Sequence, residues 1–384
     1  MSLQASGTSI SFSQISNEFG TPPAHNLGAY RVSQTVSGLL NMPLDADVPQ
    51  SGEIKFSDFY SKRLNVVVDY TSPTTVTKVT GRTDYDANNS KIVVIGNFRQ
   101  RPVSPAGTKV WIHTNGDIGS DQKSNTRSYA SLLTGNWDAT TDLRVDIGPS
   151  GRVFGAGGNG GNGGNANNKS ASGGAPGNNG TSALGVNTTV FATITNRGRL
   201  QCGGGGGGGG GGAWAQHVFY VFPDTGSSVR QTDAGGGGGG GGAGYPAGSK
   251  GNGGTAVATD GNAYHGTNDS ANGDDGHDGT LLTAGTGGLG GTAQSFASES
   301  FAGAGGNGAD NGSDASVGGN GTGNGSDGGS GQGKEPGGSP GHSGYSIVVT
   351  NSSSGVSITN TGTFHGVPFT GTLVGDILYS TTAT

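Results

Sequence analysis

Residues 201–224, QCGGGGGGGGGGAWAQHVFYVFPD, set ten consecutive glycines, Gly203–Gly212, directly against the most aromatic segment of the chain. A second run, Gly235–Gly242, follows shortly afterwards. The chain has 83 glycines in 384 residues, and 66 of them lie in residues 151–344. An ordinary globular domain contains roughly 7% glycine. Something other than a side-chain core must therefore organise this block.

A flexible linker is the simplest explanation of the glycine runs, but the segments between them argue against it. The runs alternate with apolar inserts such as TVFATITNRGRLQ, AWAQHVFYVF and YSIVVTN. Glycine and serine linkers are coils that normally lack such inserts. Mobile glycine runs would leave this apolar surface exposed to water. We therefore expect the block to be ordered.

Polyglycine II is the ordered structure that suits these runs. It is a left-handed extended helix with three residues per turn and a rise of about 3.1 Å, and it has no internal hydrogen bonds. Each N–H and C=O must then find a partner on a neighbouring helix, and glycine alone allows the backbones to approach closely enough. The two long runs would extend about 31 and 25 Å. Similar lengths favour a sandwich of parallel layers.

The segment GGNGGNGGN at 157–165 supports this interpretation because it has a period of three. That period places Asn159, Asn162 and Asn165 on one edge of the helix and leaves glycine on the faces toward its neighbours. Collagen also has a period of three, but it requires abundant proline and an unbroken repeat. The chain has 14 prolines and breaks the period repeatedly, so collagen is excluded.

Residues 64–150 are predicted to be β-strands. The runs NVVVDY, TVTKVTG, KIVVIGNF, TKVWIHTNGD, SYASLL and DLRVDIG are β-branched or aromatic and are separated by turn residues. Six or seven short strands in such a length predict an antiparallel β-sandwich.

A repeat of the form I-x-x-x-G-x-hydrophobic-x frames the glycine block. It occurs as IGPSGRVF at 147–154, ITNRGRLQ at 194–201 and ITNTGTFH at 358–365. The first two copies run directly into glycine. Repeated units of this kind usually stack.

The N-terminal residues contain two copies of a similar sequence pattern, ISFSQISNEFG at 10–20 and IKFSDFYSKRL at 54–64. Each is predicted to be a short extended segment followed by a helix, with Ser13 and Ser57 as N-caps. The module has few apolar residues, so we expect it to complete its core against another chain; the alternative is a self-contained cap. The candidate attachment residues are Phe12, Ile15, Phe19, Phe56, Phe59 and Tyr60.

The fold class predicted overall is mainly β, in four parts. These are an attachment module at 1–63, an antiparallel β-sandwich at 64–150, a polyglycine-II sandwich with short β inserts at 151–345, and a β segment at 346–384 that closes the sandwich.

Bulk properties exclude several classes of protein. A net charge of -6 with 12% charged residues gives no basic surface for nucleic acid. No apolar run approaches the roughly 18 residues of a membrane span, and the start lacks the features of a signal peptide, so we expect neither membrane insertion nor export. One cysteine, Cys202, excludes an intrachain disulfide.

Motifs for chemistry are weak, and no cofactor, metal or enzyme activity is predicted. GGNGADNGS at 305–313 matches the start of a calcium-binding repeat, with Asp310 as the candidate ligand, but the next unit lacks the aspartate. The cluster Asp274, Asp275, His277 and Asp278 is interpreted as a solvated loop.

The glycine block resembles the polyglycine-II sandwich of adhesins at the tips of long tail fibres in T-even-like bacteriophages. The resemblance rests on ITNRGRLQ leading into ten glycines, on the second run and on the aromatic inserts. The N-terminal module resembles tail proteins of marine or cyanobacterial phages. The family implies a virion protein of the phage tail, assembled in the host cytoplasm, that binds a host receptor (an outer-membrane protein or polysaccharide) through loops at the distal end of the sandwich.

Carried over, the receptor-binding role falls on the inserts. Their candidate residues are Trp214, His217, Phe219, Tyr220, Phe222, Tyr245, Tyr264, His265, Leu281, Leu282, Phe296 and Phe301. Whether the strand WAQHVFYVF is buried against the sandwich or exposed is left open. The implied partners are the receptor and other tail or baseplate proteins, the latter through the N-terminal module. Several copies per virion are expected, and a homo-oligomer is left open.

The leading hypothesis is therefore a non-catalytic tail-fibre adhesin. The alternative is a structural tail or baseplate component that uses the glycine sandwich as a rigid spacer. A glycan depolymerase is a weaker hypothesis, and so is an ice-binding protein, because the inserts are irregular and aromatic.

Overall fold

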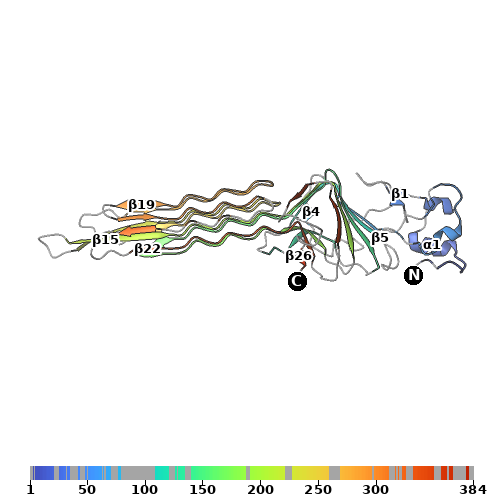
Figure 1. Ribbon diagram of the computed structural model, residues 1–384, viewed down its shortest axis with the longest axis horizontal. Helices are drawn as coiled ribbons and strands as arrows, with labels where there is room; N and C mark the ends of the chain where they lie inside the picture. Colours follow the sequence, from blue (N-terminus) through green and yellow to red (C-terminus); the bar gives the residue numbers. More distant parts are fainter. Residues whose placement is uncertain are drawn as a thin grey trace.

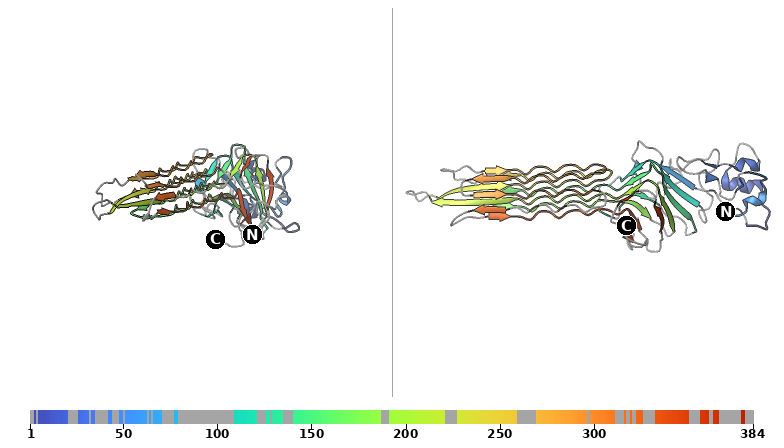
Figure 2. Two further views of the ribbon diagram at one scale, coloured as in Figure 1. Left: turned by 60° about the vertical axis from the view of Figure 1, so that its left-hand side comes forward. Right: turned by 45° about the horizontal axis from the view of Figure 1, so that its top comes forward.

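The computed structural model describes residues 3, 5–20, 26–31, 33–34, 42–43, 48–49, 51–62, 64, 66–70, 77–78, 109–120, 126–127, 129–134, 140–186, 191–220, 227–258, 269–295, 298–310, 316, 319, 322–325, 332–349, 356–360, 363–365 and 378–379. The molecule is elongated (Figures 1 and 2). A small N-terminal module lies at one end, a bundle of extended chains at the other, and β-sheets lie between them. The prediction of a mainly β fold is confirmed.

Three parallel sheets form the middle of the molecule. The first sheet contains β3 (Val66–Tyr70), β5 (Lys109–Thr114), β8 (Asp142–Ile147), β13 (Ala192–Asn196) and β24 (Val356–Asn360). The second contains β4 (Thr77–Lys78), β6 (Asp117–Gly119), β9 (Arg152–Phe154), β14 (Arg199–Gln201) and β25 (Thr363–His365). The third contains β7 (Ala130–Leu133), β12 (Ser182–Val186), β23 (Ile347–Val349) and β26 (Leu378–Tyr379).

The chain visits these sheets in rotation. It passes from β5 to β6 to β7 and then returns to the first sheet at β8, which pairs with β5 in parallel. Every strand pair within the three sheets is parallel and follows the order of the coils, among the residues described. The middle of the molecule is therefore a three-sided parallel β-helix.

The predicted antiparallel β-sandwich over 64–150 is wrong in its pairing. Short strands separated by turn residues look the same in both architectures, but here each strand pairs with the strand one full coil away. Strands beyond residue 346 join the same three sheets. The C-terminal segment thus completes the β-helix, and the predicted parts 64–150 and 346–384 form one structure.

Rows of apolar side chains fill the interior of the β-helix. Val110, Leu143 and Ala192 occupy successive rungs of the first sheet, and all three are fully buried. Leu132, Leu184 and Ile347 form an equivalent row in the third sheet. Each fully buried valine, leucine or isoleucine side chain contributes about 1.5–3 kcal/mol, so this interior stabilises the coils.

The sequence repeat stacks as predicted. Arg152, Arg199 and Thr363 lie in register in the second sheet, and each directly follows the glycine of its repeat. In the first sheet, Ile194 pairs with Ile358, but Ile147 pairs with Asn196 instead. The first copy is out of register because four residues, 148–151, separate β8 from β9, whereas two residues, 197–198, separate β13 from β14.

The glycine bundle is inserted into the β-helix. The chain leaves after β9 and returns at β12, and it leaves again after β14 and returns at β23. It crosses the bundle in extended segments, here called rods, at 155–165, 172–180, 202–212, 235–242, 247–255, 272–279, 284–291, 302–310 and 335–344, with residues 316 and 319 marking one more. Each excursion begins and ends on the β-helix, so its first and last rods are joined directly to the β-helix at one end.

The two long glycine runs form the centre of the bundle. Successive N–H groups of rod 202–212 donate to different neighbours with a period of three. Gly206 donates to Asn178, Gly207 to Gly240 and Gly208 to Ser316, at 2.8, 2.8 and 3.2 Å. Through donors and acceptors together, this rod bonds to six others, namely 155–165, 172–180, 235–242, 302–310, 335–344 and the rod of 316 and 319. Rod 235–242 also bonds to six. This is the packing predicted for polyglycine II.

The glycine content of a rod follows the number of its neighbours. The two central rods have glycine at every position of 203–212 and 235–242. Rods 155–165 and 302–310 bond to four described neighbours and have glycine or alanine at about two positions in three, whereas rod 272–279 bonds to three neighbours and keeps only Gly273, Gly276 and Gly279. The remaining positions point outward and accept side chains.

The outward positions carry amide and carboxylate groups with a structural role. The Oδ1 atoms of Asn159, Asn162 and Asn165 accept from backbone N–H groups of Ser249, Asn252 and Thr255 at 2.9, 3.0 and 2.8 Å. The predicted row of asparagines on one edge is confirmed. A second row, Asn272, Asp275 and Asp278, accepts in the same way from Ala256, Gly253 and Lys250. These rows satisfy N–H groups at the surface of the bundle that no further rod covers.

The N-terminal module contains α1 (Phe12–Phe19), the 3-10 helices η1 (Leu27–Tyr30) and η2 (Phe56–Phe59), and the short strands β1 (Ser33–Gln34) and β2 (Met42–Pro43). Ser11 caps α1 in a capping box with Gln14, and Asp58 accepts from the Lys55 N–H at the start of η2. The predicted caps Ser13 and Ser57 are therefore wrong, because each helix begins two residues earlier than a cap at its serine requires.

The module has a core of its own. Tyr30 stacks edge-on against Phe19 and Phe59, with ring centroids 6.1 and 5.6 Å apart. All three rings are fully buried, together with Ile15 and Leu64. This core lies within one chain, which fits the alternative of a self-contained cap. Its completion by another chain stays a prediction.

We predict that Gly207→Val destabilises the whole bundle. A Cβ at this position would lie 2.0 Å from the Gly306 carbonyl oxygen, so the rods must separate and lose the hydrogen bonds between them. The loss should exceed about 4 kcal/mol of unfolding free energy, at the extreme of single substitutions. The measurement is calorimetric or chemical unfolding, with Leu289→Val, on an exposed position of another rod, as the matched control. Equal melting temperatures for the two variants would contradict the packing.

A second prediction concerns the asparagine row. Asn162→Ala removes the acceptor of the Asn252 N–H, so the variant should lose about 1 kcal/mol, the usual net contribution of a hydrogen bond. Amide exchange at Asn252 should become faster, whereas Asn162→Asp, which keeps an acceptor oxygen, should preserve slow exchange. Unchanged exchange in the alanine variant would argue against this role.

Candidate functional site

Three short sheets cap the end of the bundle that lies away from the β-helix (Figures 1 and 2). One contains β11 (Ser170–Ala171), β10 (Ala166–Asn167) and β17 (Ala256–Val257). The middle one contains β18 (Asp269–Ala271), β16 (Ser227–Ala234), β15 (Ala213–Tyr220) and β22 (Gln332–Lys334). The third contains β19 (Thr292–Ser295), β20 (Ser298–Phe301) and β21 (Thr322–Gly325). We call this end, formed by these ten strands, the distal tip.

The strands continue the rods, which explains their order. β15 follows rod 202–212 and β16 precedes rod 235–242, so the central rods lead into the central hairpin. β15 and β16 pair over their whole length, from Ala213 opposite Ala234 to Tyr220 opposite Ser227. The bundle therefore fixes the position of every described strand at the tip.

The β15 strand shows the alternation that its sequence predicts. Ala213, Ala215 and His217 are buried, whereas Trp214, Gln216 and Val218 are half-buried. The Trp214 indole lies against the backbone of Gly333 on β22, because a Cβ on that glycine would be 1.9 Å from the indole Nε1. In its described part, the strand is thus packed within the tip on both faces.

Hydrogen bonds between polar groups join two of the sheets at the distal tip. Asp233 on β16 is fully buried. Its carboxylate accepts from Gln231 Nε2 at 3.1 and 2.9 Å and from the Asn168 N–H at 3.1 Å. Burial raises the pKa of Asp233 above its ordinary value, although these hydrogen bonds act in the opposite direction. Asn168 lies in the turn between β10 and β11, so the carboxylate holds that turn against the central sheet.

This turn has the left-handed backbone of a two-residue hairpin. Asn168 and Lys169 have φ values of 42° and 68°, as a type I′ turn requires at both of its central residues. Both side chains are exposed. The turn therefore presents an amide and an ammonium group at the tip.

The structure brings only part of the predicted receptor-binding set to the distal tip. Trp214, His217 and Phe301 lie on β15 and β20, and Phe219 and Tyr220 belong to the backbone of β15. Phe222, Tyr264, His265 and Phe296 lie outside the described residues.

Tyr245, Leu281 and Leu282 lie at the opposite end of the bundle, so their predicted place among the distal inserts is wrong. The Tyr245 carbonyl accepts from Ser120 of the β-helix at 2.9 Å, and Gly244 donates to Thr280 at 3.1 Å. Rods alternate in direction, so every second connection must return to the β-helix. A signal existed in the sequence, because the connections AGYP and TLLT are short and those at the tip are long.

The candidate attachment residues differ in how exposed they are. Ile15, Phe19 and Phe59 are fully buried in the module's core and cannot contact another protein in this conformation. Phe12 and Tyr60 are half-buried, and Phe56 is 42% exposed. Phe56 is therefore the candidate most available for attachment.

The acidic motifs belong to rods. Asp274, Asp275, His277 and Asp278 are exposed, as their interpretation as a solvated segment requires, but they lie in rod 272–279 and not in a loop. Asp275 accepts from Lys250 Nζ at 2.7 Å, and this contact lowers the pKa of its carboxyl. Asp310 accepts from the Ala284 N–H at 2.8 Å. In the part of the chain that the structure describes, no group of three His, Cys, Asp or Glu side chains could hold a metal ion, and no helix is long and apolar enough to cross a membrane.

The comparisons with known proteins define the class of this molecule. A family model of phage tail fibre adhesins matches residues 74–375, which span the β-helix and the glycine bundle. The chain belongs to this family, described as phage tail fibre adhesin Gp38. The resemblance noted for the glycine block is thereby confirmed, and the protein is a component of a phage tail. The N-terminal module lies outside the matched residues.

Among solved structures, the chain is similar to a protein in the crystal structure of the gp37-gp38 adhesin tip complex of the bacteriophage S16 long tail fibre. The two share 17% identity with a TM-score of 0.31, over 83% of this chain and 89% of the other. No curated protein sequence matches the chain. The family assignment rests on the family model.

We predict that Asp233→Asn stabilises the protein at neutral pH. Because the pKa of the native carboxyl is raised above 3.8, the native state holds its proton more tightly than the unfolded chain. Stability is then lost as the pH rises from 3.8 through the raised pKa. The asparagine removes this loss, so its advantage in urea unfolding should be greatest at pH 7 and vanish near 3.8. Asp233→Ala, which removes the acceptor, should be destabilising, and an asparagine variant less stable at pH 7 would contradict the sign.

Proposed function

We propose that the distal tip binds a receptor on the host surface, an outer-membrane protein or polysaccharide, without catalysis. The observation that carries this proposal is the polarity of the molecule: the N-terminal module and the tip lie at opposite ends, with the β-helix and the bundle between them (Figure 1). A rod of ten glycines extends about 31 Å. A surface held at this distance from the β-helix is suited to reach a partner outside the phage.

The rigidity of the tip supports a role in recognition. The hairpin of β15 and β16 grows from the two central rods, each bonded to six neighbours. A binding surface whose backbone is fixed in advance loses little conformational entropy when a partner binds. The aromatic residues of this hairpin are of the type that dominates protein interfaces.

The N-terminal module is the proposed site of attachment to other tail or baseplate proteins, with Phe56 as its exposed aromatic contact. Assembly would take place in the host cytoplasm, with several copies in each virion. A chain with its own β-helix and module can attach to the tail through this end while the tip remains free.

The test is a truncation of the hairpin. Val218 and Val229 are direct cross-strand partners, so an Asn-Gly turn can join them and replace residues 219–228 without changing the register. The shortened protein should keep its melting temperature but lose binding to host cells and inhibition of phage adsorption. Leu282→Ser, exposed at the opposite end of the bundle, is the matched control and should bind normally.

Two outcomes would contradict the proposal. If the truncated protein binds cells as well as the full chain, the receptor contact lies elsewhere. If the full chain neither binds cells nor inhibits adsorption, the bundle is better explained as a structural spacer within the tail.

A further inference from the structure

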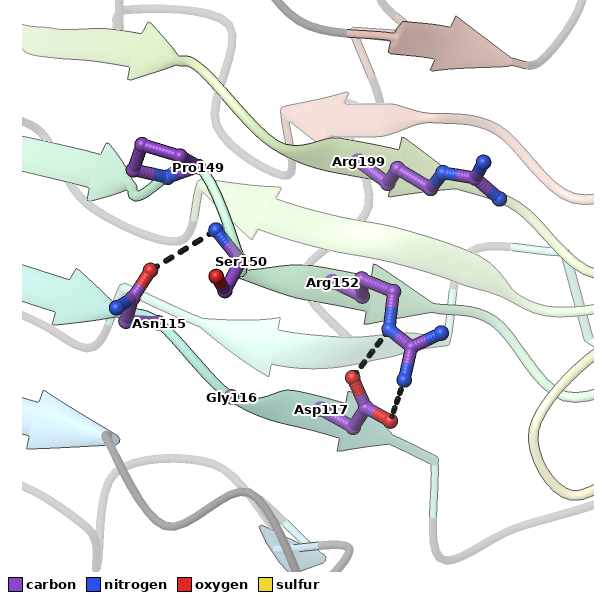
Figure 3. Close-up of a pocket in the computed structure, with 7 residues that line it drawn as sticks. All are labelled: Asn115, Gly116, Asp117, Pro149, Ser150, Arg152 and Arg199. Atoms are coloured by element: carbon purple, nitrogen blue, oxygen red, sulfur yellow. Dashed lines mark hydrogen bonds and ion pairs between the residues drawn. The ribbon is translucent and has the colours of Figure 1, made fainter.

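A pocket of about 380 Å³ lies on the β-helix, where the turns between the first and second sheets stack (Figure 3). Its walls are residues 115–117, Pro149, Ser150, Arg152 and Arg199. The second sheet leads directly into the rods, so the pocket lies near the base of the glycine bundle and away from the distal tip. Nothing in the proposed role of the tip uses it.

The pocket exists because one coil has a longer turn than its neighbours. Two residues connect β5 to β6 and β13 to β14, but four connect β8 to β9. The extra residues, Pro149 and Ser150, are exposed and occupy the central positions of a turn closed by Gly151 N–H and the Gly148 carbonyl at 2.8 Å. Proline suits the first of these positions. The Ser150 N–H donates to Asn115 Oδ1 at 3.0 Å, which fixes the turn over the coil before it.

The wall of the pocket has two arginine side chains but one acidic side chain. Parallel register sets Asp117 beside Arg152, and Arg152 beside Arg199. Arg152 donates through Nε and Nη2 to the two oxygens of Asp117, both at 2.5 Å. Arg199 is exposed, and no acidic side chain of the described residues pairs with it. The row therefore carries one excess positive charge.

The two guanidinium groups extend in the same direction from adjacent strands (Figure 3). Like charges on neighbouring strands repel each other, and Asp117 offsets only one of them. A bound anion would offset the second. Guanidinium groups bind carboxylate and phosphate through paired hydrogen bonds, and Arg152 also keeps N–H groups that Asp117 does not use.

We propose that this pocket binds an acidic sugar unit, one that carries a carboxylate or a phosphate, within a polysaccharide of the host surface. Arg199 takes the anionic group, the Ser150 hydroxyl bonds a sugar hydroxyl, and the Pro149 ring contacts the apolar face of the sugar ring. The volume lies within the range of small-molecule sites. A concave site of mixed polarity suits a sugar better than it suits the flat surface of a protein partner. This inference rests on the proposed adhesin function, to which it adds a second contact.

The test measures free sugars against the full chain by calorimetry or NMR titration at low salt. The probes are glucuronate and glucose 6-phosphate, with glucose, acetate and inorganic phosphate for comparison. At least one acidic sugar should bind about tenfold more tightly than glucose, acetate and inorganic phosphate. Glucuronate and glucose 6-phosphate distinguish a carboxylate from a phosphate as the natural anion.

Arg199→Gln should weaken this binding by about tenfold, the effect of losing a hydrogen bond to a charged group. Arg199 is exposed, so the variant should fold normally. The matched control is Arg144→Gln, whose guanidinium pairs with Asp142 at 2.8 Å on the first sheet outside the pocket. This control should not change the affinity.

Equal binding of acetate or inorganic phosphate would overturn the proposal, because the sugar would then contribute nothing. Unchanged affinity in Arg199→Gln would overturn it as well. The hairpin-truncated protein should keep its affinity for free sugar. A failure of the tip to bind cells and a failure of this pocket to bind sugar are therefore distinguishable.

Discussion

The whole distal half of the molecule depends on one constraint: a polyglycine-II helix cannot satisfy its own backbone. Each N–H and C=O must pair with a neighbouring rod, and the period of three directs successive groups toward different neighbours. A central rod is stable only when six others surround it, as both long glycine runs are. The bundle therefore forms as a unit, since ordering glycine is entropically costly and no single rod recovers that cost alone.

The β-helix acts as a template for the bundle, because it fixes where the rods that join it begin. Its coils are held by buried aliphatic rows such as Val110, Leu143 and Ala192. β9 and β14 pair in register, Arg152 with Arg199, and both continue directly into rods. The rods thus start side by side with the correct spacing. An apolar core stabilises the β-helix, whereas backbone hydrogen bonds between rods stabilise the bundle.

The glycine bundle could be predicted from the sequence because the three-residue period that orients each rod is visible within a short segment. The period of GGNGGNGGN fixes which side of a rod faces its neighbours, and the Asn162 side chain lies where that period places it. The β-helix could not be predicted in the same way. Its strands were identified, but the pairing of β5 with β8 depends on residues one full coil apart, and short strands with short turns fit a sandwich equally well. For the tip, the sequence predicted the strand that contains Trp214 but left its burial open, and the structure packs the indole against Gly333. The position of Leu282 depends on the direction of each rod, which composition does not encode.

The near absence of side chains inside the bundle also shapes its response to temperature. Unfolding a core of aliphatic side chains exposes apolar surface and gives a large positive change in heat capacity, whereas exposing peptide groups lowers that change. The interior of the bundle consists of peptide groups at the positions of Gly203–Gly212 and Gly235–Gly242. The free energy of unfolding of the bundle should therefore change almost linearly with temperature, while that of the β-helix follows the curved dependence of an ordinary apolar core. A phage that meets its host in cold water would then present a tip supported by the part of the molecule whose stability does not decline on cooling.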